Sequence, residues 1–226
     1  MQFFRFGHPR ALLGAIGALF FACAITRAQT VVMVSNLSQP GNGSVPVAYY
    51  PPDDGPASHY DAAQGFTTGP AASLLQAITL SVGGGSGSGF SVALYSDASG
   101  LPGSLIETLN GSSSPASAGS YSYTSGGSAI LTANTSYWWI ASVPDGAGSF
   151  LGFNLNSTNS TSETSAFGWT AGDVFRQQQN GGGWGPSGQP LLFSVSASAI
   201  PEPGTYAAWA GAAVLGLAVV RRRRSR

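Results

Sequence analysis

The chain has 226 residues, a formal net charge of zero and only 8% charged residues. The two terminal segments are described below. Between them, residues 29–200 contain eight aspartates and glutamates but only one lysine or arginine, Arg176. A surface with one cation has almost nothing to neutralise phosphate groups, so this composition excludes nucleic acid as a partner.

The N-terminal segment has the three parts of a secretory signal peptide. Two arginines precede an apolar stretch over residues 11–25, which is shorter than the roughly 20 residues that a membrane-spanning helix needs. Small residues, Thr26 and Ala28, then occupy the −3 and −1 positions of a cut between Ala28 and Gln29. We therefore predict that residues 1–28 direct export and are removed.

Two other interpretations of this segment stay open. One is an uncleaved N-terminal membrane anchor, and the other is acylation at Cys23, as in lipoprotein signals. Phe20 and Phe21 stand where lipoprotein signals usually carry an aliphatic and a small residue, which disfavours acylation. Because Cys23 is the only cysteine of the chain, cleavage after Ala28 leaves a mature protein without disulfides.

Residues 29–196 are predicted to form one extracellular antiparallel β-sandwich or jelly-roll-like domain. Their many aromatic residues exclude disorder, which goes with few aromatics and many charges. Alternation of apolar and polar residues predicts strands at 75–82, 90–95, 137–143 and 190–196, and a weaker pattern predicts strands at 45–50, 104–109, 119–124, 128–131 and 150–155. Glycine-rich runs, among them 83–89 and 180–183, are predicted to be turns, and no helical stripe appears.

The C-terminal segment has three parts in a fixed order. A tether over residues 197–204 ends in the motif Pro201, Glu202, Pro203 and Gly204. Residues 205–220 are apolar and predict a single transmembrane helix of roughly 24 Å, slightly shorter than a ~30 Å hydrocarbon core. Residues 221–226 form a basic tail, predicted to stay in the cytoplasm as a membrane stop through Arg221, Arg222, Arg223 and Arg224.

These three parts together resemble the PEP-CTERM sorting signal over residues 200–226. The resemblance implies recognition by an exosortase, processing near the Pro-Glu-Pro motif, and transfer from the inner membrane to the cell surface or the extracellular matrix. An ordinary single-pass anchor with an arginine stop is the alternative.

Three fragments of the predicted β-domain, residues 64–69, 94–103 and 131–138, resemble the group called choice-of-anchor R. This resemblance implies a β-rich extracellular domain that occurs with varied anchors. It implies no known activity, so it assigns no functional residues.

Residues suited to catalysis are few in the mature span. His59 is the only histidine after the leader, and Asp61 lies close to it in the sequence. A Ser-His-Asp site needs both to converge on one serine, and no Gly-x-Ser-x-Gly elbow between a strand and a helix is present. We therefore predict a protein that is not an enzyme and has no cofactor; an envelope hydrolase that uses His59 or two facing carboxylates is the least favoured alternative.

Candidate ligand-binding residues are two tryptophans and one aspartate. Trp138 and Trp139 are consecutive in a predicted strand, so they face opposite sides of the sheet. An exposed outer tryptophan would stack on sugar rings; the favoured alternative is that a loop or a second layer covers it. Asp97 is expected to cap the turn at 96–100, with calcium binding as an open alternative, whereas zinc is disfavoured because one His and no Cys leave only carboxylates.

The sequence thus predicts an exported, non-enzymatic surface or matrix protein with an exosortase as its processing partner. Its β-domain is expected to be a structural or interaction module. The alternative is a carbohydrate-binding module for exopolysaccharide, recognised by an exposed Trp or Tyr platform.

Overall fold

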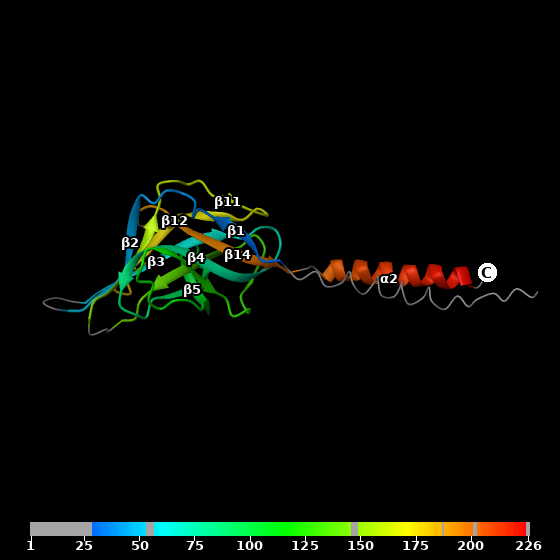
Figure 1. Cartoon of the computed structure of the whole chain (residues 1–226), viewed down its shortest axis with the longest axis horizontal. Helices are drawn as coiled ribbons and strands as arrows, with labels where there is room; N and C mark the ends of the chain where they lie inside the picture. Colours follow the sequence, from blue (N-terminus) through cyan, green and yellow to red (C-terminus); the bar gives the residue numbers. More distant parts are fainter. Residues whose placement is uncertain (1–28, 53–56, 146–148, 187, 201–202, 225–226) are drawn as a thin grey trace, which may run out of the picture. The chain divides into compact units, whose positions relative to one another are not determined.

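The computed structural model describes residues 29–52, 57–145, 149–186, 188–200 and 203–224 (Figure 1). Thr30–Ile200 form one compact unit, and α2, Pro203–Arg224, belongs to a separate one. The described strands are β1 Val31–Ser35, β2 Gly43–Tyr50, β3 Ser58–Thr67, β4 Ser73–Ser86, β5 Ser91–Asp97, β6 Pro102–Thr108, β7 Gly119–Thr124, β8 Ile130–Leu131, β9 Ser136–Ser142, β10 Leu151–Ser157, β11 Thr164–Ser165, β12 Thr170–Gln179, β13 Gly185–Pro186 and β14 Phe193–Ala199.

The predicted all-β class is confirmed, and the named strands pair antiparallel throughout. They form one continuous sheet in the order β11-β1-β14-β4-β10-β2-β3-β9-β5-β6, with β7 and β8 also on β4, and β12 with its partner β13 on β3. The strands predicted to form a sandwich or jelly roll thus belong to one sheet, in which β10 and β2 link the strands before and after them in this order by hydrogen bonds.

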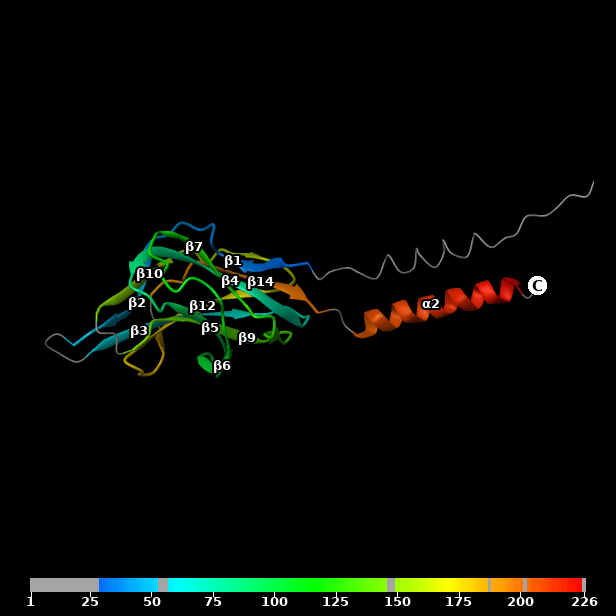
Figure 2. The same cartoon turned by 60° about the horizontal axis from the view of Figure 1, so that its bottom comes forward.

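The continuous sheet folds over so that its two halves face each other. In Figure 2, β1 and β7 lie along one side of the domain, and β5, β6 and β9 lie along the other. The rings of Trp139 in β9 and Phe193 in β14 approach to 5.7 Å, although their strands are far apart in the sheet order. The apolar face of each half therefore covers the other.

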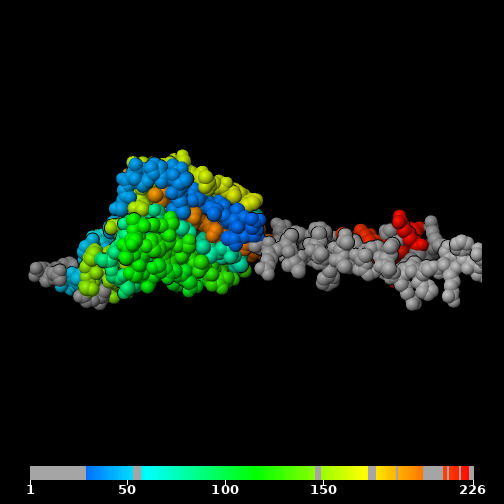
Figure 3. All heavy atoms as spheres, in the orientation of Figure 1, coloured from blue at the N-terminus to red at the C-terminus, as the bar shows by residue number. Residues whose placement is uncertain are grey.

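The core between the halves is rich in large aromatic side chains. Phe66 and Trp169 stack with ring centroids 5.9 Å apart, and Phe90 packs edge-on against Phe153 at 5.0 Å. Each such pair contributes on the order of 0.5–1.5 kcal/mol beyond its burial. In the face seen in Figure 3, the middle of the chain, drawn green, covers the centre of the domain.

Two buried amides fix the segment that leads into β14. Asn36 donates to the carbonyl oxygen of Leu191 at 2.8 Å and accepts from the backbone N–H of Phe193 at 2.7 Å. Gln64 accepts from the backbone N–H of Leu191 at 3.1 Å and donates to the carbonyl of Gly172. Because a buried polar group without partners is costly, these bonds hold β1, β3 and the start of β14 in one register.

The nine predicted strands match β2, β4–β10 and β14, but their bounds shift at several places. The run 83–89 is a turn only in its last part, because β4 continues through Gly83–Ser86 and pairs with β10. An added Cβ on Gly85 would lie 2.3 Å from the Phe153 ring and 2.5 Å from the Gly152 carbonyl oxygen. Only glycine permits this close approach of two strands. The glycine-rich composition of this run, which is typical of a turn, therefore belongs to a strand.

The strands β1, β3, β11, β12 and β13 were not predicted from the sequence. In β3 the reason is visible, since both of its faces are covered between Ala62 and Phe66. Part of β3 consists of small residues that leave room for the Trp138 ring. A Cβ added to Gly65 would lie 3.5 Å from atoms of that ring. A strand with both faces buried shows no alternation of apolar and polar residues.

The C-terminal helix α2 has 22 residues, beginning before the predicted residue 205 and continuing through the arginines to Arg224. Pro203 at its first position fits a helix start, where the missing N–H costs nothing. Since β14 extends to Ala199, the tether is shorter than the predicted 197–204. Among the described residues, no helix is long and apolar enough to cross a membrane. The leader, with Ala28, and the motif residues Pro201 and Glu202 lie outside the described part.

Replacing Gly85 by alanine should destabilise the domain by about 1–3 kcal/mol, because the new methyl group collides with backbone and ring atoms of β10. Gly183→Ala is the matched control, since nothing lies within 4 Å of its added Cβ. Urea unfolding of both variants measures the difference. Equal stability of the two variants would contradict the close β4–β10 pairing.

Candidate functional site

The predicted sugar-stacking tryptophans are both buried, so neither forms a surface platform. Trp139 lies in the main core with no exposed surface, and Trp138 is 4% exposed on the opposite face of β9. The two tryptophans face opposite sides of the sheet as predicted, and the outer one is covered, because Tyr95 and Trp184 pack over the cluster that contains Trp138. Trp184 lies in the connection between β12 and β13, which the sequence did not predict as a hairpin.

Asp97 caps its turn as predicted and also holds Trp138. Its two carboxylate oxygens accept from the Gly100 N–H at 3.1 and 3.2 Å, and Oδ1 accepts from the Trp138 indole N–H at 2.7 Å. Within the described ranges, no group of three or more His, Cys, Asp or Glu side chains is suited to hold a metal ion. The contacts of Asp97 thus join the β5–β6 turn to β9.

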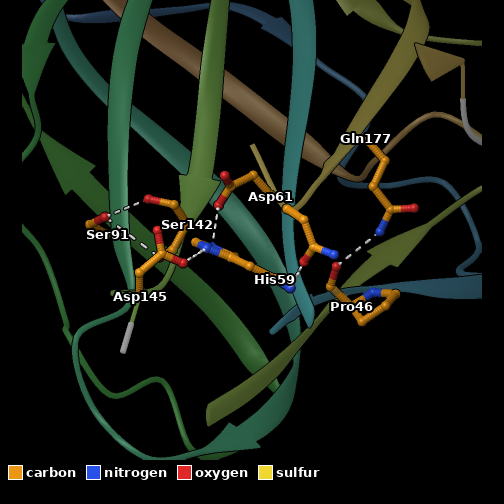
Figure 4. Close-up of polar contacts among 8 residues, drawn as sticks. Pro46, His59, Asp61, Ser91, Ser142, Asp145 and Gln177 are labelled. Atoms are coloured by element: carbon orange, nitrogen blue, oxygen red, sulfur yellow. Dashed lines mark hydrogen bonds and ion pairs between the residues drawn. The ribbon is translucent and has the colours of Figure 1, made fainter. Parts of the chain in front are cut away.

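His59 lies between two carboxylates, from different parts of the chain (Figure 4). Its Nε2 is 3.0 Å from Asp61 Oδ1, and its Nδ1 contacts Asp145, whose side chain is 78% exposed. Ser91 and Ser142, in the same view, bond to each other with their Oγ atoms 3.0 Å apart. A Ser-His-Asp site needs one ring nitrogen directed at the serine, and here carboxylates occupy both nitrogens.

Burial of the Asp61 carboxyl raises its pKa above the ordinary value of 3.8. The neighbouring His59 lowers this pKa by attraction and hydrogen bonding, and the charge of Asp145 raises it again, but burial is the largest cause. Burial also raises the pKa of Tyr95, with a further contribution from Asp61. The cluster therefore links β3, β5 and the segment after β9 electrostatically.

A groove lies over β2, β10 and the end of β4, where the sequence predicted no site. It has a volume of about 270 Å³ and contains no charged lining residue; it is lined by Pro46, Ala48, Tyr50, Gly85, Ser86, Phe150, Gly152, Phe153 and Asn154. Along β2, Val45, Val47 and Tyr49 point into the core, so Pro46, Ala48 and Tyr50 face the groove. The alternation of side chains along β2 thus places one set of residues in the core and the other set at the groove.

Two aromatic rings form one border of this groove. Tyr50 and Phe150 are 43% and 45% exposed, and their ring centroids are 4.9 Å apart. The β2–β10 register brings them together, since Tyr49 pairs with Leu151. The Phe150 ring lies over Gly152, where an added Cβ would be 2.2 Å from Cζ. Sequence alone gave no sign of this pairing, because the two residues are 100 positions apart.

A second hollow of about 320 Å³ is different in character. It is lined mainly by apolar residues, among them Met33, Pro70, Phe167 and Trp169. Phe167 is 69% exposed and has a φ of 53°, an uncommon conformation for a bulky residue. This hollow offers few groups that hydrogen-bond a polar ligand.

The chain matches no known protein-family model, and no curated protein matches it.

The pH dependence of stability provides a test of the Asp61 environment. A raised pKa means that the fold favours the neutral carboxyl; this stabilisation is complete below pH 3.8 and is lost as the pH rises through the raised value. Asp61→Asn cannot ionise, so its stability relative to the wild type should increase between about pH 3 and pH 5.

Urea unfolding at the two pH values measures this trend. In a His59→Ala background the same substitution should give a steeper trend, because the attraction that lowers the Asp61 pKa has gone. A relative stability of Asp61→Asn that falls with pH would show that the attraction of His59 outweighs burial.

Proposed function

We propose that this chain is an exported protein of the cell surface or extracellular matrix, sorted by an exosortase through its C-terminal PEP-CTERM signal. Its β-domain is a non-enzymatic interaction module. In this proposal, residues 205–220 anchor the chain in the inner membrane until processing, with Arg221–Arg224 on the cytoplasmic side.

The position of the Pro-Glu-Pro motif carries the proposal. The compact β-domain ends at Ile200, directly before Pro201, and helix α2 begins at Pro203. The motif therefore separates a complete domain, with its own core, from an apolar segment followed by arginines. A peptidase that cuts near such a motif releases the domain without removing any of its strands.

The geometry of His59 supports a non-enzymatic domain. A general base must have a free ring nitrogen within reach of the group that it deprotonates. In the described structure both nitrogens of His59 contact carboxylates, from Asp61 and Asp145. This arrangement fastens chain segments to each other, and it supports the envelope-hydrolase alternative less well.

Export should remove the first 28 residues, because small residues precede Gln29 after the apolar stretch. N-terminal sequencing of the exported protein should begin at Gln29. An acylated N-terminus at Cys23 would instead identify a lipoprotein, and a start at Met1 would identify an uncleaved anchor.

Replacing Pro201, Glu202 and Pro203 by alanines should leave the protein uncut in the inner membrane, because the peptidase signal is gone and the apolar segment remains. An epitope inserted after Gly182, in an exposed loop, follows the protein through cell fractionation. Replacing the arginines should act differently, by weakening the hold on the cytoplasmic side.

Thr161→Ala together with Ser162→Ala, two exposed loop residues, controls for alanine substitution itself. This control should reach the surface like the wild type. Surface delivery of the Pro-Glu-Pro variant at the wild-type level would rule out exosortase sorting and identify a plain anchor.

A further inference from the structure

We propose that the groove bordered by Tyr50 and Phe150 binds an uncharged polysaccharide. The site deepens the proposed interaction role of the β-domain and rests on it. It lies away from the two tryptophans at which the sequence placed sugar stacking.

The first argument is the exposure of two aromatic rings on one border. A sugar ring presents a face of C–H groups that packs on an aromatic face, while its hydroxyls point outward to polar partners. Tyr50 and Phe150 are each more than two-fifths exposed and touch each other, so together they offer an extended apolar surface next to the groove.

The second argument is that these rings are held in place before any ligand arrives. Tyr60 packs edge-on against Tyr50, with centroids 6.0 Å apart, and its hydroxyl accepts a hydrogen bond from Gln179 at 2.9 Å. Phe150 rests on Gly152. A pre-arranged surface loses less entropy on binding, which favours a ligand of many weak contacts.

The third argument is that polar side chains line part of the groove. Asn154 and Ser86 are exposed lining residues, and no hydrogen bond joins either side chain to another described residue. An amide provides two donors and an acceptor, and a hydroxyl provides both roles. Sugar hydroxyls also donate and accept, so these two side chains suit them.

The lining excludes other ligand classes. Without a cation in the groove, phosphate, sulfate or uronate groups have no partner there. A peptide that adds a strand needs an open sheet edge, but β10 already pairs with β2 on one side and β4 on the other. A neutral chain of sugars remains as the occupant that the groove fits.

The test uses the whole exported chain, purified in detergent, in affinity electrophoresis through gels that contain dextran, xylan, laminarin or hydroxyethyl cellulose. Alginate serves as the anionic comparison. We expect at least one neutral polymer to retard the wild type, and isothermal titration with its oligosaccharides to give saturable binding. Tyr50→Ala and Phe150→Ala should each weaken this binding about ten-fold or more, which is about 1.4 kcal/mol.

Two further variants separate the groove from a general loss of structure. Ser86→Trp fills the groove but keeps both rings, and it should abolish retardation while leaving the unfolding transition in place. Phe167→Ala removes a more exposed ring outside the groove and should bind like the wild type.

Three results would overturn the proposal: no retardation by any of the four neutral polymers, retardation by alginate alone, or wild-type binding by Tyr50→Ala and Ser86→Trp. Because binding is measured on purified protein, a failure here leaves exosortase sorting untouched, and a failure of sorting leaves the groove untouched.

Discussion

The close pairing of β4 with β10 is the contact on which the rest of the domain depends. The first half of β4 pairs with β14, and its second half, beyond Val82, pairs with β10. This second pairing needs glycine at position 85, where a side chain would collide with Phe153. β4 thus links β14 to β10 in the continuous sheet, which folds over so that Trp139 lies against Phe193.

A second glycine, Gly152 of β10, lies at the surface of this pairing. On the outer face, Gly152 pairs with Ser86 and carries no side chain of its own, and the groove lies over this part of the sheet. The register of β2 against β10 then places Tyr50 next to Phe150 at its border. The pairing of β4 with β10 thus contributes residues both to the core and to the groove.

The sequence predicts the class of fold well, because half-buried strands alternate between core and surface, as 75–82 and 119–124 do. It fails where both faces of a strand are covered, as in β3, and where glycine serves a strand, as in β4. It fails for the site for a different reason. The exposure of Trp138 depends on a hairpin far along the chain, and the meeting of Tyr50 with Phe150 depends on strand register, which alternation within one strand does not reveal.

The histidine cluster and the groove are connected through one chain segment. Asp145 and Phe150 lie near the two ends of the connection between β9 and β10. His59 holds the Asp145 end to β3, while the start of β10 holds the other end beside β2. His59 also packs edge-on against Tyr49, the neighbour of Tyr50, with ring centroids 6.4 Å apart. His59 therefore contacts both segments from which the two rings project, and this places it to support the aromatic border.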